Sequence, residues 1–96
     1  MTIEETLKNK RDEIRRIAAR HGAHNVRIFG SVVRGEAEVD SDIDFLVDVG
    51  PERTSFFPGG LIADLQDLLG REVDVVTEDS LHWYIRERVI KEAIPL

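Results

Sequence analysis

The chain has 96 residues and a formal net charge of −6, and 42% of its residues are hydrophobic. This length supports one hydrophobic core, so we expect a single domain over residues 1–96, and the acidic charge disfavours direct nucleic-acid binding, which relies on an excess of Lys and Arg. Because the chain contains no Cys, disulfide bonds, thiolate metal sites and Cys nucleophiles are excluded.

The sequence contains no candidate membrane segment. No apolar run approaches the ~20 residues that cross a bilayer. The polar start, Met1-Thr2-Ile3-Glu4-Glu5, does not resemble a signal peptide. We therefore expect a cytoplasmic protein without a membrane partner.

The first part of the chain predicts a helix followed by a strand. Thr2 and Glu5 have the spacing of a capping box, and apolar side chains then recur at helical spacing as far as His21. Gly22 is a suitable residue to follow the last helical turn. Residues 26–29 predict a short strand that leads directly into a Gly-Ser pair.

The remainder of the chain alternates in the same way. It predicts, in order, a polar connection over residues 32–41 with one helical turn near 32–34, a strand over 42–49, a helix over 61–69, a strand over 73–76 and a helix from 80 to the residue before Pro95. The order of helices and strands predicts an α+β fold, a two-layer α/β domain in which helices pack on a small mixed β-sheet.

Two acidic side chains open the second predicted strand. Asp42 and Asp44 are two residues apart and therefore point to the same face, with Cα atoms roughly 6.5 Å apart. Two carboxylates held ~4 Å apart repel each other by ~4 kcal/mol at an effective dielectric constant of about 20. A bound Mg²⁺ or Mn²⁺ ion would relieve this repulsion, because hard oxygen ligands suit these cations. The alternative is that Asp42 caps a turn after Ser41 and Asp44 faces solvent.

Gly30 and Ser31 directly follow the first predicted strand. A glycine there lets the backbone approach a ligand closely, and exposed N–H groups together with the Ser31 hydroxyl can hold phosphate oxygens. Taken alone, the pair is better interpreted as a plain turn that ends a strand. A phosphate cradle beside two carboxylates is, however, what phosphoryl or nucleotidyl transfer requires.

These motifs resemble a known family. Gly30-Ser31, ten residues and then Asp42-x-Asp44 resemble the signature of the DNA polymerase β-type nucleotidyltransferases, and the fuller string around them resembles the smallest members, the minimal nucleotidyltransferase (MNT) domains. The resemblance extends to residues 69–76, Leu-Gly-Arg-Glu-Val-Asp-Val-Val, and to the closing residues 90–94. Residues 56–60, Phe-Phe-Pro-Gly-Gly, depart from the family's pattern of a continuous helix.

The resemblance implies a catalytic role for three carboxylates. Asp42 and Asp44 would hold two Mg²⁺ ions that bridge the phosphates of ATP. Asp74 would bind the catalytic metal and help to deprotonate the acceptor hydroxyl. Asp74 is expected in a strand with Val neighbours, where a carboxylate is costly unless it is paired or metal-bound, although a solvent-facing edge position explains it equally well.

The resemblance also implies a nucleotide-binding segment. Gly30 and Ser31 would contact the triphosphate, and Arg34 would reach a phosphate. For Arg34 the alternative is a pair with Asp40 or Asp42 that only holds the loop.

Other conspicuous side chains are expected to be structural. Arg71, just before the third strand, is interpreted as a surface charge. One of Trp83 and Tyr84 is expected in the core and the other in solvent, where an exposed aromatic could bind a partner. Phe56 and Phe57 are expected to pack into the core, with a contact patch as the alternative. The three His residues lack the spacing of metal ligands.

A domain of this size has no room for a separate acceptor-binding domain, so we expect a macromolecular acceptor. MNT proteins are known as antitoxins paired with HEPN-domain ribonuclease toxins, and the resemblance implies transfer of AMP from ATP to a tyrosine of such a toxin. An acidic domain suits a basic toxin. Two alternatives remain: a non-catalytic antitoxin that neutralises its toxin by binding it, and a nucleotidyltransferase with a small-molecule acceptor.

Overall fold

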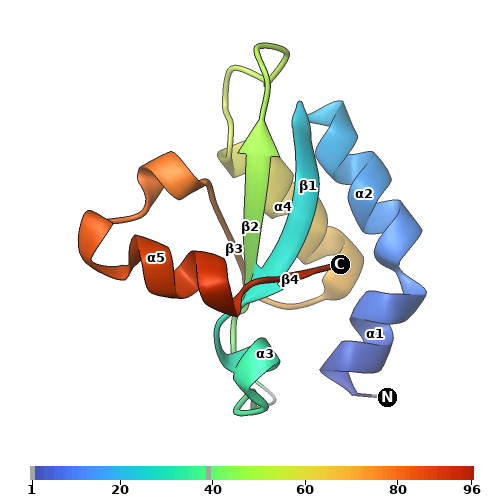
Figure 1. Cartoon of the computed structure of the whole chain (residues 1–96). Coiled ribbons are helices and arrows are strands. Elements are labelled where there is room, and N and C mark those ends of the chain that lie inside the picture. The colour runs from blue at the N-terminus through green and yellow to red at the C-terminus, as the bar shows by residue number, and fades with distance from the viewer. Residues whose placement is uncertain (1, 39) are drawn as a thin grey trace.

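The computed structural model describes residues 2–38 and 40–96. Its elements follow in chain order (Figure 1): α1 (Ile3–Asn9), α2 (Arg11–Arg20), β1 (Ala23–Phe29), α3 (Ser31–Arg34), β2 (Ile43–Val49), α4 (Gly59–Leu69), β3 (Val73–Val76), a 3₁₀ helix η1 (Glu78–Ser80), α5 (Trp83–Glu92) and β4 (Ile94–Pro95). None of the helices in these two ranges is long and apolar enough to cross a membrane.

The predicted first helix is divided into α1 and α2 by a break at Lys10. Thr2 caps α1 as predicted, since its side chain accepts a hydrogen bond from the Glu5 N–H. The backbone of Lys10 leaves helical geometry, yet its N–H still donates to the Thr6 carbonyl and its carbonyl accepts from the Ile14 N–H. The helical extent was therefore predictable, but the change of direction at Lys10 was not.

The strands form one mixed sheet in the order β3-β2-β1-β4. β1 is antiparallel to both β2 and β4, whereas β2 and β3 are parallel. This sheet with its packed helices confirms the predicted α+β fold. The two-residue β4 was not expected, because so short a strand leaves no pattern in the sequence.

The sheet carries helices on both faces. On one face α2 and α4 bury the main core, which includes Ile14, Phe45 and Leu65. On the other face α5 lies across the strands (Figure 1), and its Val89 packs near Leu46 in a second cluster. Both faces of β2 are therefore covered at its centre, where Phe45 and Leu46 are each 0% exposed, and this fixes the strand that carries Asp44.

The burial of the aromatic side chains agrees only in part with the predictions. Trp83 and Tyr84 are 75% and 76% exposed, so the expectation that one of them is buried is wrong: the first turn of α5 projects beyond the sheet. Phe57 packs against the main core as predicted, but Phe56 is 84% exposed. The chain turns after Phe57, and α4 begins at Gly59.

Candidate active site

Strand register brings the predicted site residues to one end of the sheet. Asp44 lies opposite Phe29 of β1 and opposite Asp74 of β3. Gly30 directly follows Phe29, and Asp42 directly precedes β2. The Gly-Ser pair and the three carboxylates, although up to 44 residues apart in sequence, therefore belong to the same edge.

The fold itself requires a glycine at position 30, whether or not a ligand binds there. Its φ of +83° is a conformation that glycine adopts without strain. A Cβ atom at this position would also collide with the Asp44 carboxylate. The missing side chain thus makes room for Asp44 against the backbone where β1 ends and α3 begins.

Asp44 lies in an unfavourable electrostatic environment. Partial burial, followed by the charges of Asp74 and Asp42, raises the pKa of its carboxyl from 3.8 to about 6. The positive charge of Arg34 lowers this pKa, and the negative charge of Glu92 raises it. The charges of the cluster are therefore not balanced by the basic groups around it.

The carboxylates fit a hard divalent cation by their chemistry. They offer oxygen ligands only, and an added cation would offset the repulsion that raises the pKa of Asp44. Asp42 and Asp74 are exposed, whereas Asp44 is half-buried. Within residues 2–38 and 40–96 the side chains do not already converge into a cluster of three or more possible metal ligands. Exposed Asp42 and Asp74 side chains are free to change rotamer around Asp44.

Arg34 forms two ion pairs. Its Nε donates to Glu36 at 2.9 Å, and its Nη1 donates to Glu92 at 2.8 Å. These partners differ from Asp40 and Asp42, which were the alternative to a phosphate contact. Both hydrogen bonds raise the pKa of the Arg34 guanidinium, and the bond to Glu92 contributes most. Arg34 nevertheless lies close enough to Asp44 for its positive charge to lower the pKa of that carboxyl.

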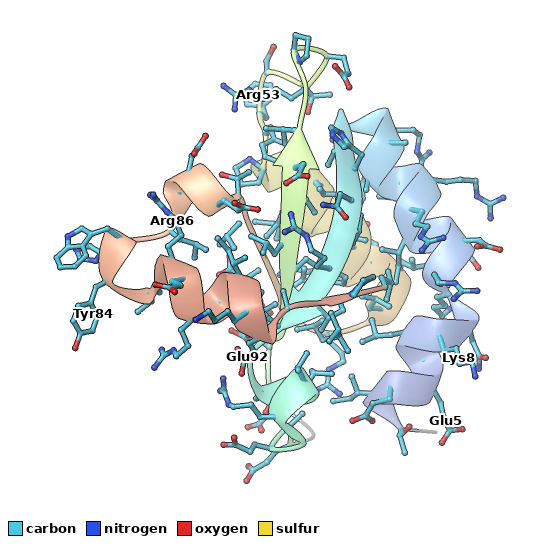
Figure 2. All side chains as sticks on the ribbon, viewed as in Figure 1. Glu5, Lys8, Arg53, Tyr84, Arg86 and Glu92 are labelled. Atoms are coloured by element: carbon cyan, nitrogen blue, oxygen red, sulfur yellow. The ribbon has the colours of Figure 1, made fainter. Side chains whose placement is uncertain are left out.

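Glu92 is a site residue that sequence reasoning missed. It ends α5, and one of its carboxylate oxygens accepts a hydrogen bond from the Gly30 N–H at 3.2 Å. Figure 2 shows it at the end of α5, next to α3. No local pattern relates Glu92 to Gly30, because 62 residues separate them and only the packing of α5 on the sheet brings them together.

Arg71 is a structural anchor, and the prediction of a surface charge is wrong. The side chain is half-buried, and its Nη2 donates to the Glu38 carbonyl at 2.9 Å and to the Ser41 carbonyl at 2.8 Å. Arg71 therefore ties the start of β3 to the loop that carries Asp42.

Comparison with known proteins decides the family. Residues 7–96 match the model of the nucleotidyltransferase domain family. The chain belongs to this family. The enzyme class predicted from the Gly30-Ser31 and Asp42-x-Asp44 motifs, a nucleotidyltransferase, is confirmed.

Relatives of this nucleotidyltransferase cover most of its length. It is 39% identical over 94 residues to the protein adenylyltransferase MntA of Thermococcus cleftensis, with 96% of this chain and 90% of the relative covered. It is 38% identical over 78 residues to a candidate protein adenylyltransferase of Methanocaldococcus jannaschii, with 81% and 84% covered.

Solved structures show the same fold. A candidate minimal nucleotidyltransferase superposes with a TM-score of 0.83 at 49% identity and covers 96% of this chain and 94% of its own. A toxin–antitoxin structure with AMP-PNP superposes with a TM-score of 0.73, over 88% of this chain and 69% of its own. Its 21% identity limits that likeness to the fold.

Proposed function

We propose that residues 1–96 form a single nucleotidyltransferase domain that transfers AMP from ATP to a hydroxyl group of a partner toxin, in the cytoplasm. The observation that carries the proposal is the sheet edge where Asp44 lies opposite Asp74 and against Gly30. This edge combines a backbone segment suited to phosphate with carboxylates suited to Mg²⁺ or Mn²⁺.

The nucleotide would bind along the turn between β1 and α3. Gly30 and Ser31 would donate to the triphosphate, and Arg34 would add a positive charge. Asp42 and Asp44 would hold two divalent ions together with the phosphates, and Asp74 would share the ion nearer the acceptor. When bound, these ions neutralise charge on the phosphates and on the leaving pyrophosphate.

The chemical step is an in-line substitution at the α-phosphorus. The acceptor oxygen forms a bond to this phosphorus while the bond to the bridging oxygen of the β-phosphate breaks, and pyrophosphate leaves. A carboxylate oxygen of Asp74 would accept the proton that the hydroxyl loses. The exposed position of Asp74 supports this role, because the acceptor arrives from solvent.

A protein acceptor is supported by the surface as well as by the relatives. Trp83 and Tyr84 form an exposed aromatic pair at the start of α5, and aromatic side chains are enriched where proteins bind proteins. Relatives that cover most of the chain are named protein adenylyltransferases, and toxin–antitoxin structures share the fold. From the MNT resemblance we infer a HEPN-domain ribonuclease as the toxin and a tyrosine as the modified residue.

The direct test is incubation of the protein with ATP, Mg²⁺ and a HEPN toxin encoded beside it, followed by mass spectrometry of the intact toxin. We expect the toxin to gain the mass of one or more AMP units on a hydroxyl side chain. Asp44→Asn should abolish the gain and Asp67→Asn, at an exposed position of α4, should preserve it.

The same experiment separates catalysis from masking. An enzyme turns over, so substoichiometric amounts should neutralise the toxin, whereas a masking protein must be present at one to one or more. An unmodified toxin that is still neutralised by a variant lacking Asp42, Asp44 and Asp74 would contradict the proposed transfer.

A further inference from the structure

A carboxylate of the chain already binds the groups expected to hold nucleotide phosphate. One oxygen of Glu92 accepts from the Gly30 N–H at 3.2 Å, and the other accepts from Arg34 Nη1 at 2.8 Å. The Glu92 side chain is only 18% exposed, compared with 48% for Arg34. Glu92 thus reaches inward from the end of α5 and bridges two donors at opposite ends of α3.

The geometry of this bridge is that of an anion site. A carboxylate and a phosphate both present paired oxygens to N–H donors, and both are bound well by a guanidinium group. Gly30 has a single N–H group, so it cannot donate a full hydrogen bond to Glu92 and to a phosphate at the same time. Binding of a phosphate at this point therefore requires that Glu92 release it.

The architecture allows Glu92 to leave without unfolding α5. The helix is anchored to the sheet by Val89, which is 5% exposed, and the segment before it by Leu81, which is 8% exposed. Neither anchor depends on the Glu92 carboxylate. A change of side-chain rotamer is sufficient to free both donors.

We propose that Glu92 is an internal competitor for the phosphate-binding site, which a nucleotide must displace from Gly30 and Arg34 in order to bind. This proposal rests on the proposed function, since it assumes that nucleotide phosphates occupy that turn. It assigns to Glu92 a role in setting nucleotide affinity.

The opposing interpretation is that Glu92 only positions Arg34 for the nucleotide. The two interpretations predict changes of opposite sign. Removal of a competitor strengthens nucleotide binding, whereas removal of a positioning group weakens it. The affinity of a non-hydrolysable nucleotide therefore discriminates between them without any measurement of catalysis.

The experiment is calorimetric titration of AMP-PNP with Mg²⁺ into wild-type protein, Glu92→Ala, Glu92→Gln and the control Glu87→Gln. Glu87 lies on the same helix and pairs with Lys91, at 3.0 Å on the exposed surface. We expect about tenfold tighter binding for Glu92→Ala, corresponding to ~1.4 kcal/mol, a smaller gain for Glu92→Gln and no change for the control. The Gly30 amide resonance should shift in Glu92→Ala, and in wild-type protein when the nucleotide is added.

The outcomes separate this proposal from the function on which it rests. Unchanged or weaker binding in both Glu92 variants, with wild-type protein binding the nucleotide, would overturn the competitor role and leave the proposed function standing. A wild-type protein that does not bind AMP-PNP would overturn both. If Glu92→Ala fails to fold, the isosteric Glu92→Gln still decides the sign.

Discussion

Substitution of Asp44 by Asn should stabilise the metal-free protein at neutral pH. Partial burial, Asp74 and Asp42 raise the pKa of the Asp44 carboxyl from 3.8 to about 6, so the folded state holds this proton more tightly than the unfolded chain does. The extra stability is complete below about pH 3.8 and is lost as the pH rises through about 6. Asn cannot ionise, and the variant should escape this loss.

The size of the effect follows from the same shift. At about 1.4 kcal/mol for each pH unit, the difference between 3.8 and about 6 corresponds to at most ~3 kcal/mol. Because Asp44 is only half-buried, solvent screening reduces this value, and we expect ~1–2 kcal/mol. For a domain of this size the gain corresponds to a rise in melting temperature of about 5–15 °C.

The assay is urea denaturation of wild-type protein and Asp44→Asn in EDTA between pH 4.5 and pH 8. The variant should be more stable at pH 7.5, and the difference should shrink towards pH 4.5. Asp67→Asn, at an exposed site on α4, is the matched control and should follow wild-type protein throughout. A difference that does not change with pH, or an Asn variant that is less stable at pH 7.5, would refute the electrostatic argument.

Three further predictions address the rest of the site. Gly30→Ala should lose at least ~2 kcal/mol of unfolding free energy in urea denaturation, because alanine is strained at a φ of +83° and its Cβ would meet the Asp44 carboxylate. Arg71→Met should leave the loop before β2 untethered, and we expect a loss of ~1–2 kcal/mol by the same measurement together with weaker Mg²⁺ binding by calorimetry; unchanged Mg²⁺ affinity would argue against a role in placing Asp42. ATP should bind weakly in EDTA and at least tenfold more tightly with Mg²⁺, because the carboxylates repel a free triphosphate; equal affinities would count against a metal-assisted site.

Local sequence patterns were sufficient to predict most helices and strands and to single out the residues of the candidate site. Hydrophobic periodicity depends on the spacing of neighbouring residues, and it placed the strand around Asp44 and the helix that ends before Gly70 to within a few residues. A common face for Asp42 and Asp44 was predicted from strand alternation alone; in the structure Asp42 directly precedes β2 and Asp44 lies within it. Together with these carboxylates, the Gly30-Ser31 motif predicts chemistry on phosphates.

Contacts between distant segments required the tertiary structure. The parallel register that sets Asp74 beside Asp44 depends on how α4 returns the chain to the sheet. The bridge from Glu92 to Gly30 spans 62 residues and exists only because α5 packs across the second face of the sheet. Neither arrangement leaves a periodic signal in the sequence, because the partners share no helix turn or strand with each other.

The tertiary structure also determines whether a single side chain is buried or exposed. Arg71 and Trp83 both stand at the borders of predicted elements, and composition alone does not distinguish an anchor from an exposed group. Arg71 is held by two loop carbonyls, whereas Trp83, the first residue of α5, is 75% exposed. Burial depends on which surfaces meet when helices dock on the sheet, and residue type and spacing constrain that docking only weakly.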